Sequence, residues 1–355
     1  MSQDQTSQGP VATCSRGFWG LAGRIGPCAQ IGGALSSLFA DFLRFDDRDR
    51  KKLVICGISA GFASVLGTPI AGAIFGVEVL FVGSILYDVL LPSFVAGVVG
   101  YQVASGLGIT YFHNPINFAP VFSSSFSIEV VMAGIFFGLC SFLLIEILRS
   151  GKRISDRISW GLPWKGLIGG CILVGLTLLY SKKYLGLGLE TIQTSLAGEG
   201  GPWYGFFLKM VFTSLTLNFA GSGGIVVPIL FVGATAGALF GEILQANIAT
   251  FAAIGFVSLL AGATNAPVAA SILFLELFGP EIAPYAAIAC VISFLMTGHR
   301  SVHPTQVLAI RKSTSLQVEI GSDLENVKAE FKPRGRSLIG AALRLIRAIQ
   351  EKRHS

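Results

Sequence analysis

Two stretches of the chain, GTPIAGAIFGVEVL at residues 67–80 and NAPVAASILFLELF at residues 265–278, decide its fold. Both are apolar, both have a proline near the start, and both carry a glutamate near the end. Pro69 and Pro267 are 198 residues apart, and the two glutamates have the same separation. Two related multi-helix units at such an interval are the usual plan of a transporter fold, so the sequence predicts an internally repeated protein.

The composition indicates that these units lie in a membrane. Of the 355 residues, 52% are hydrophobic and 13% are charged, and the mean hydropathy is +0.68. A soluble domain carries about 25% charged residues, and a disordered chain has far less apolar surface, so both classes are excluded. The 44 glycines lie inside apolar runs, as they do in transmembrane helices whose backbones approach closely. The sequence therefore predicts a polytopic membrane protein.

A second pair of stretches repeats at nearly the same interval. RIGPCAQIGGALSSLF (24–39) is similar to GIVVPILFVGATAGALF (224–240). Proline fits the first turn of a helix and fails in its interior, so a proline inside an apolar run predicts a helix that begins partway through the bilayer. Irregular backbone at that depth is tolerated where it lines an aqueous cavity, which predicts a permeation site. The four such breaks are Gly26-Pro27, Thr68-Pro69, Val227-Pro228 and Ala266-Pro267.

Basic residues predict the orientation of the chain. They gather in Arg44–Lys52, in Arg149–Arg157 and in the segment 300–355, whereas the segments near 110–127 and 184–203 have almost none. Cytoplasmic loops of membrane proteins carry an excess of Lys and Arg, so we expect the first three to be cytoplasmic and the last two to be external. Positive charge distributed in this way does not suggest a nucleic-acid partner.

The chain is expected to divide into five segments. Its tail differs from the rest, because Ser337–Lys352 has apolar residues at helical spacing with basic residues between them. This part is either a solvated cytoplasmic helix or a helix that lies on the membrane surface. The expected segments are a polar N-terminus (1–16), the remainder of a first membrane repeat (17–109), an external linker (110–127), a second membrane repeat (128–312) and a basic cytoplasmic tail (313–355).

The first repeat is expected to be incomplete. About 100 residues separate the end of the linker from Pro228, whereas 26 residues precede Pro27. Roughly 75 residues of helix would then be missing from the first copy of the repeat. We therefore expect the chain to be truncated at its N-terminus.

Three motifs carry a resemblance to a known family. GRIGP at 23–27, followed by QIGG at 30–33, resembles the GREGPxxQIGG segment of the CLC chloride channel and transporter family. GGIVVP at 223–228 resembles the GGIFAP anion-binding segment of that family, and SVHPTQ at 301–306 resembles its SxYxxQ segment. With LGLGLETI at 185–192, the resemblance runs from about residue 17 to about residue 312. It implies an all-α, inverted-repeat bundle of tilted and broken transmembrane helices.

The physics of a helix start fits this resemblance. A helix N-terminus leaves up to four N–H groups unpaired and carries about half a positive charge, so it can bind a desolvated anion without Lys or Arg. A buried full charge would hold the anion too tightly to conduct it. The resemblance implies that the N–H groups of Ile225 and Val226 hold a central anion and that those around Ile25 and Gly26 hold an outer one. The remaining residues of the two helix-start motifs are Gly23, Arg24, Pro27, Gly224 and Pro228.

Three positions depart from the pattern of the family. The gating glutamate, which competes with the anion and carries protons, falls at Ile25, and the inner proton-accepting glutamate of exchangers falls at Val79 beside Glu78. The tyrosine that contacts the central anion falls at His303, whose imidazole N–H can still donate a hydrogen bond. Isoleucine and valine do not titrate, so these departures favour passive conduction.

Several roles remain open at the level of the sequence. Glu78 and Glu276 occupy equivalent repeat positions near helix ends, and each is either a structural hydrogen-bonding group or part of a water path. His303 is either an anion ligand or a packing residue of a loop. Arg24 is interpreted as a structural counter-charge rather than an anion ligand.

The predicted function is transport of chloride or a similar monovalent anion across a membrane, through a channel-like path. The alternatives are a non-conducting truncated remnant or packing subunit, and an anion/proton antiporter with altered coupling. No nucleotide-binding, metalloprotease or Ser/His/Asp motif is found, so neither an enzyme nor a cofactor or metal site is predicted. The resemblance also implies a homodimer, with the apolar faces of 67–108 and 265–298 at the interface and the protein in the cell inner or plasma membrane.

Overall fold

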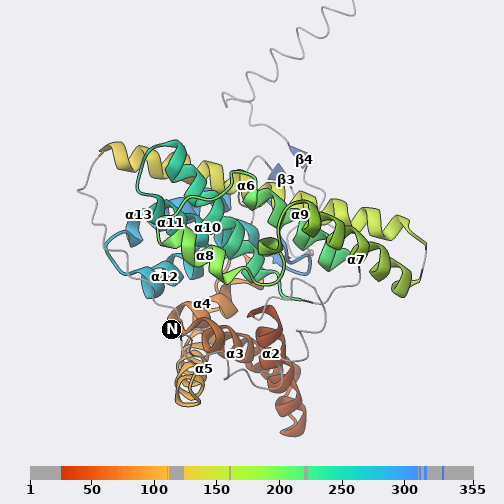
Figure 1. Cartoon of the computed structure of the whole chain (residues 1–355). Coiled ribbons are helices and arrows are strands. Elements are labelled where there is room, and N and C mark those ends of the chain that lie inside the picture. Colours follow the sequence, from red (N-terminus) through yellow and green to blue (C-terminus); the bar gives the residue numbers. More distant parts are fainter. Residues whose placement is uncertain are drawn as a thin grey trace, which may run out of the picture.

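The chain folds into two groups of helices that meet at their shorter members (Figure 1). The computed structural model describes residues 25–109, 111, 124–159, 161–219, 223–310, 312, 316–317 and 330–331. The predicted helix at 337–352, together with the first 24 residues, lies outside the described part of the chain.

The first group is a series of four helices in the lower part of Figure 1, coloured red to orange. A two-residue strand, β1 (Phe81–Val82), lies between the third and fourth helices of this series along the chain. The four helices are α2 (Ile25–Phe42), α3 (Asp47–Leu66), α4 (Pro69–Glu78) and α5 (Tyr87–Gly106).

The second group lies above the first and contains the longest helix, α6 (Ser124–Arg157). The strand β2 (Val307–Leu308) pairs in parallel with β1, so the segment after the last helix of this group is attached to the first group. The other elements are α7 (Leu162–Leu179), η1 (Lys182–Tyr184), α8 (Leu189–Leu196), α9 (Gly205–Asn218), α10 (Val226–Ile243), α11 (Ile248–Thr264), α12 (Pro267–Phe278), α13 (Ala283–Met296), β3 (Leu316–Gln317) and β4 (Glu330–Phe331).

The predicted repeat is present in the structure as two matching series, α2–α5 and α10–α13. The four predicted breaks are helix starts: α2 and α10 each have a proline at their third position, and α4 and α12 each begin with a proline. The sequence therefore located all four starts to within two residues.

Matching helix pairs also pack in the same way in the two series. A Cβ atom at Gly57 of α3 would lie 2.2 Å from the carbonyl oxygen of Gly32 in α2. A Cβ atom at Gly255 of α11 would lie 2.4 Å from the carbonyl oxygen of Gly233 in α10. Both pairs thus bring their backbones into direct contact, which is possible because neither glycine places a side chain between them.

The two series are joined by reciprocal capping between α4 and α12. The Glu78 carboxylate, at the end of α4, accepts hydrogen bonds from the backbone N–H groups of Val268 (3.0 Å) and Ala269 (2.7 Å) in the first turn of α12. The Glu276 carboxylate of α12 accepts from Ile70 (2.9 Å) and Ala71 (2.8 Å) in the first turn of α4. Each glutamate therefore satisfies helix-start donors of the other repeat and places negative charge at the positive end of that helix.

Two predicted loops form parts of helices. Asp46 caps α3 by accepting from the backbone N–H of Asp49 at 2.9 Å, and Asp47 and Asp49 lie in the first turn, so most of the Arg44–Lys52 segment is helical. Acidic residues in a first turn are favoured by the helix dipole. The Arg149–Arg157 segment continues α6 without a break, and α6 begins at Ser124, inside the predicted linker.

The apolar stretch at 301–310 does not form a helix. It contains irregular backbone and β2, and Pro304 falls in its middle. The strand pair with β1 supplies hydrogen bonds from Val307 to the Leu80 carbonyl (3.1 Å) and from Ala309 to the Val82 carbonyl (3.1 Å).

Three of the described helices are long and apolar enough to cross a membrane: Tyr87–Gly106, Ser125–Arg157 and Val226–Ile243. Five further apolar helices are shorter, and these include the proline-started α4 and α12. When membrane helices are broken at mid-membrane depth, they give short helices of this kind inside an apolar bundle.

The reciprocal caps can be tested through stability. Glu276→Gln removes the charge and one acceptor oxygen from the start of α4. We expect it to lower the thermal unfolding midpoint of the detergent-solubilised protein, by an amount equivalent to about 1–2 kcal/mol. Glu281→Gln, at an exposed loop position, should leave the midpoint unchanged. Equal midpoints for Glu276→Gln and the unaltered protein would show that the cap does not stabilise the fold.

Candidate functional site

The first turns of α2 and α10 lie against each other. A Cβ atom at Gly26 would be 2.9 Å from the Cα of Gly224, so the two backbones touch where the helices start. Ile25 and Val226, the first residues of these helices, are each only 3% exposed. The structure therefore buries two helix N-termini side by side.

The start of α10 has unpaired donors. Its N-cap residue is Ile225, which has no oxygen to offer, and no side chain caps this helix. The first hydrogen bond of the helix runs from Ile229 to the Ile225 carbonyl. Among the described residues, none accepts a hydrogen bond from the backbone N–H groups of Val226 and Val227. These donors are free to bind a ligand.

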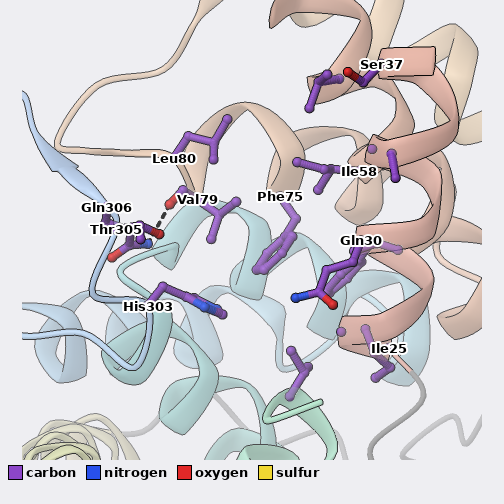
Figure 2. Close-up of a pocket in the computed structure, with 17 residues that line it drawn as sticks. Ile25, Gln30, Ser37, Ile58, Phe75, Val79, Leu80, His303, Thr305 and Gln306 are labelled. Carbon is purple, nitrogen blue, oxygen red and sulfur yellow. Dashed lines mark hydrogen bonds between the residues drawn. The ribbon is translucent and has the colours of Figure 1, made fainter. Parts of the chain in front are cut away.

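A cavity of about 500 Å³ opens beside these helix starts. Figure 2 shows Ile25 at one end and Ser37 at the other, with the Gln30 amide and the His303 ring directed into the space between. The lining residues are Ile25, Gly26, Ala29, Gln30, Gly33, Ala34, Ser37, Val54, Ile58, Phe62, Phe75, Val79, Leu80, Val226, His303, Thr305 and Gln306.

The cavity wall combines apolar and neutral polar groups. The stacked rings of Phe62 and Phe75, with centroids 4.1 Å apart, form part of the apolar side. None of the seventeen lining residues is Asp, Glu, Lys or Arg. Backbone N–H groups, amides, hydroxyls and an imidazole are what this cavity offers a ligand, so its donors are neutral or, for His303, titratable.

Five of the residues predicted from the sequence border this cavity: Ile25, Gly26, Val79, Val226 and His303. They come from α2, from the end of α4, from α10 and from the loop after α13, so the fold brings together segments almost 280 residues apart.

The other predicted residues lie around the cavity or elsewhere. Ile225 and Gly224 directly precede α10, and Pro27 and Pro228 lie in the first turns of α2 and α10. Gly23 and Arg24 fall outside the described residues. Glu78 is not a lining residue, because its two carboxylate oxygens face the start of α12.

Gln306 lies within the SVHPTQ motif and has no role assigned from the sequence, yet the structure places it in the cavity lining beside Thr305. Its Nε2 donates to the carbonyl oxygens of Val79 (2.5 Å) and Thr264 (2.7 Å), and the first of these bonds is drawn in Figure 2. Its Oε1 accepts from Asn265 Nδ2 at 3.1 Å. The Gln306 amide thus ties the end of α4 to the end of α11, and it fixes the loop that carries His303.

Asn265 and Lys312 extend this network away from the cavity. Asn265 also donates to the Arg300 carbonyl (3.0 Å), and its Oδ1 accepts from Lys312 Nζ (2.6 Å). The Lys312 ammonium donates in addition to the Phe294 carbonyl (2.8 Å) and lies over the Phe294 ring. A polar residue inside an apolar stretch was the available signal for Gln306, but its partners are distant in sequence.

Two buried helix starts, of which that of α10 has no side-chain cap, lie beside a cavity in a repeated bundle of broken helices, and this arrangement defines a membrane protein of the transporter and channel class. The family model described as voltage gated chloride channel matches residues 9–298. The chain therefore belongs to the voltage-gated chloride channel (CLC) family, and the predicted family and fold class are confirmed.

Individual relatives agree with this assignment. The chain is 39% identical over 296 residues to a chloride/fluoride channel protein of Pseudomonas syringae pv. tomato, covering 81% of this chain and 65% of that protein. It is 30% identical over 301 residues to the voltage-gated ClC-type chloride channel ClcB of Escherichia coli O17:K52:H18, covering 79% of this chain and 69% of ClcB. The chain thus spans about two thirds of the length of these relatives.

A solved structure shows the same fold. The crystal structure of a CLC-type fluoride/proton antiporter matches with a TM-score of 0.78 and 29% sequence identity, over 81% of this chain and 73% of that one. The chain is accordingly a helical membrane protein of the CLC type.

The contact between the two helix starts can be tested with a single methyl group. Gly26→Ala places a Cβ against the backbone of Gly224, which cannot move aside as a flexible side chain would. We expect a fall in the thermal unfolding midpoint equivalent to about 1–3 kcal/mol, the usual range for overpacking. Gly170→Ala in α7, where no atom lies within 4 Å of the new methyl group, should leave the midpoint unchanged or raise it slightly. A normal midpoint for Gly26→Ala would contradict the close contact.

Proposed function

We propose that this chain forms a path for chloride or a similar monovalent anion through a membrane, and that the path runs through the cavity beside α2 and α10. The observation that carries the proposal is the pair of buried helix starts at a cavity with no charged side chain among its described lining residues. The printed names of the relatives, a chloride/fluoride channel and a chloride channel, support the same substrate class.

The cavity suits a desolvated anion for a simple electrostatic reason. The N-terminal end of a helix carries about half a positive charge, and its field is strong where the surroundings are apolar. In this proposal the backbone N–H groups at Ile225 and Val226 hold a central anion, and those at Ile25 and Gly26 hold an outer one. His303 donates from its ring across the cavity. Partial charges bind an anion weakly enough for it to leave.

We further propose that conduction is passive. Coupled exchange with protons requires groups that change protonation along the path. In this chain Ile25 and Val79 border the cavity where the family resemblance would put acids, and Glu78 faces the start of α12 instead. The known relatives include a protein described as a fluoride/proton antiporter, so coupling is the property that the assay below must measure.

The orientation follows from the basic residues. The segments Arg44–Lys52 and Arg149–Arg157 and the C-terminus are proposed to face the cytoplasm, with the protein in the inner or plasma membrane. Exposed apolar side chains cover the outer faces of α5, α12 and α13, and we propose this surface as a homodimer interface. It includes Leu91, Val95, Val99, Val268, Leu275, Ile288, Val291 and Leu295.

The orientation is tested by cysteine labelling. A cysteine introduced at Lys51, in a background where the exposed Cys171 is replaced by serine, should resist a membrane-impermeant maleimide added to intact cells. A cysteine at Glu199 should react with it. Labelling at position 51 from outside would overturn the proposed topology.

Anion transport is tested in proteoliposomes that contain the purified protein. We expect a chloride gradient to drive chloride efflux, and we expect that gradient to drive no uphill movement of protons. Ile25→Glu should introduce a block that is relieved as the pH falls toward the ordinary pKa of a glutamate, about 4.3, because the carboxylate competes with the anion for the same N–H donors. Ile25→Gln, which has the same length and no charge, is the matched control.

Each outcome of this assay decides a separate point. Absence of efflux would favour the second candidate, a chain that packs beside other subunits without conducting. Uphill proton movement in the unaltered protein would contradict passive conduction. An unchanged pH profile for Ile25→Glu would show that Ile25 does not lie at an anion site.

A further inference from the structure

One face of α2 lines the cavity from Ile25 to Ser37. The lining residues Ile25, Ala29, Gly33 and Ser37 are spaced by four, as expected for one side of a helix. Twelve residues of helix span about 18 Å, so Ser37 lies at the opposite end of the cavity from the paired helix starts. We call this end, beside the connection between α2 and α3, the Ser37 mouth.

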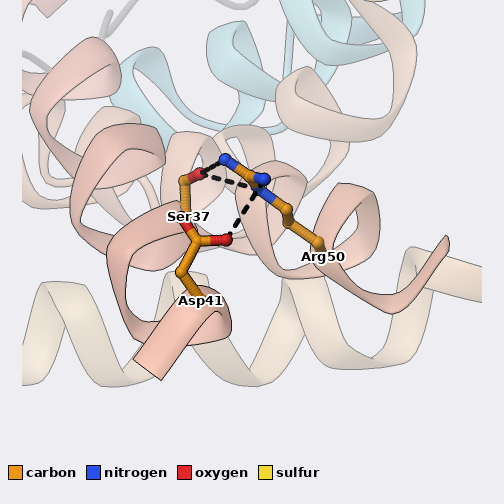
Figure 3. Close-up of polar contacts among 3 residues, drawn as sticks. All are labelled: Ser37, Asp41 and Arg50. Atoms are coloured by element: carbon orange, nitrogen blue, oxygen red, sulfur yellow. Dashed lines mark hydrogen bonds and ion pairs between the residues drawn. The ribbon is translucent and has the colours of Figure 1, made fainter. Parts of the chain in front are cut away.

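The Ser37 mouth is bordered by a guanidinium group. Arg50, in the first turns of α3, directs both its Nε (3.0 Å) and its Nη2 (2.9 Å) at Ser37 Oγ. Its Nη1 forms an ion pair with Asp41 Oδ1 at 3.1 Å. Figure 3 shows the three side chains meeting, with Ser37 and Asp41 on one helix and Arg50 on the other.

This geometry determines the orientation of the Ser37 hydroxyl. A serine oxygen can accept two hydrogen bonds and donate one. Two N–H groups of the one Arg50 guanidinium converge on the Ser37 oxygen from the same side, so the O–H proton points away from Arg50. Within the described part of the chain, no oxygen accepts that proton, and Ser37 borders the cavity. The guanidinium also withdraws charge from the oxygen it contacts, which strengthens the hydroxyl as a donor.

The charges around the mouth are nearly balanced. The Arg50 and Asp41 side chains are 42% and 52% exposed, so water screens much of their field. Lys52 nearby forms ion pairs with Asp49 and Asp88, both at 3.7 Å, and is not itself a lining residue. The mouth therefore presents the polarised, neutral hydroxyl of Ser37. Behind it lies the Arg50 guanidinium, whose charge is partly neutralised by Asp41.

We propose that Ser37 and Arg50 form an anion-binding site at this mouth of the cavity, for the same monovalent anion that the proposed function assigns to the helix starts. The Ser37 hydroxyl donates to the anion directly. Arg50 orients and polarises that hydroxyl and supplies a long-range positive field. Asp41 weakens this field, so the site binds an anion only weakly and releases it. The inference rests on the proposed function only for the identity of the ligand.

The experiment uses bromide, a chloride analogue that can be located by anomalous diffraction. Crystals of the unaltered protein and of variants would be soaked in bromide, and halide affinity would be measured by calorimetry in detergent. We expect one bromide near Ser37 Oγ and another between the starts of α2 and α10. In Ser37→Ala the first peak should disappear and the second should remain, and the affinity of the mouth should fall roughly tenfold.

Charge variants test the roles of the partners. Arg50→Gln should lower the bromide affinity of the Ser37 mouth by a similar factor. The double variant Ser37→Ala/Arg50→Gln should bind bromide little more weakly than either single variant, because the two groups act as a unit. Asp41→Asn should tighten binding several-fold, since it leaves the guanidinium without its neutralising partner. The matched controls are Ser64→Ala, Lys52→Gln and Asp49→Asn, which make comparable changes at residues that take no part in the Ser37–Arg50–Asp41 contacts.

The outcomes separate this inference from the proposed function. A bromide at the helix starts with none at Ser37 would overturn the mouth site and leave the function standing. A bromide at Ser37 with none at the helix starts would do the reverse. A peak near Ser37 that survives Ser37→Ala, or a variant that loses thermal stability while its halide affinity is unchanged, would show that the Ser37–Arg50 contact only joins two helices.

Discussion

The structure depends on how it satisfies the backbone N–H groups of helices that begin inside an apolar interior. Such donors cannot turn to water, and each one left unpaired in a low-dielectric surrounding raises the free energy by about 1–3 kcal/mol. Four helices of the two repeats begin this way. Among the described residues, the first-turn N–H groups have protein partners in some of these helices and none in α10. The helices with partners join the two repeats, and the start of α10 borders the candidate site.

In α4 and α12, every first-turn donor has a partner. The leading proline has no N–H, the next two N–H groups are accepted by a glutamate of the opposite repeat, and the fourth bonds to the N-cap carbonyl. By contrast, α10 begins with Val226 and Val227 uncapped, beside the start of α2 and next to the cavity. The same sequence feature, a proline in an apolar run, therefore gives a capped helix start in one place and uncapped N–H donors beside a cavity in another. What differs is whether a carboxylate is within reach.

The sequence predicted what depends on local pattern. Prolines at the repeat interval located all four helix starts, and the motifs pointed to Ile25, Gly26, Val226, Val79 and His303, which border one cavity. It could not predict contacts set by the packing of distant elements. Glu78 and Glu276 remained open between two roles because their partners are about 190 and 206 residues away. Charged residues near 44–52 indicated a loop, and no pattern in the sequence shows that Arg50 reaches across to Ser37.

Under the proposed function, a path for an anion must both bind and release it, and the charges of the described residues fit both requirements. Three described charged groups near the cavity have protein partners: Glu78 at the start of α12, Lys312 with Asn265 and Phe294, and Arg50 with Ser37 and Asp41. The side chains that line the cavity are neutral or titratable donors and apolar surface. A full positive charge in direct contact would interact with an anion at about 4 kcal/mol even at an effective dielectric constant of 20, which would slow release by several hundredfold. Helix ends and a polarised hydroxyl act with fractions of that charge. No acid is found among the described lining residues, which has the complementary effect, since an ionised carboxylate would compete for the same donors. Under the proposed function, such a cavity would bind an anion weakly enough to release it quickly.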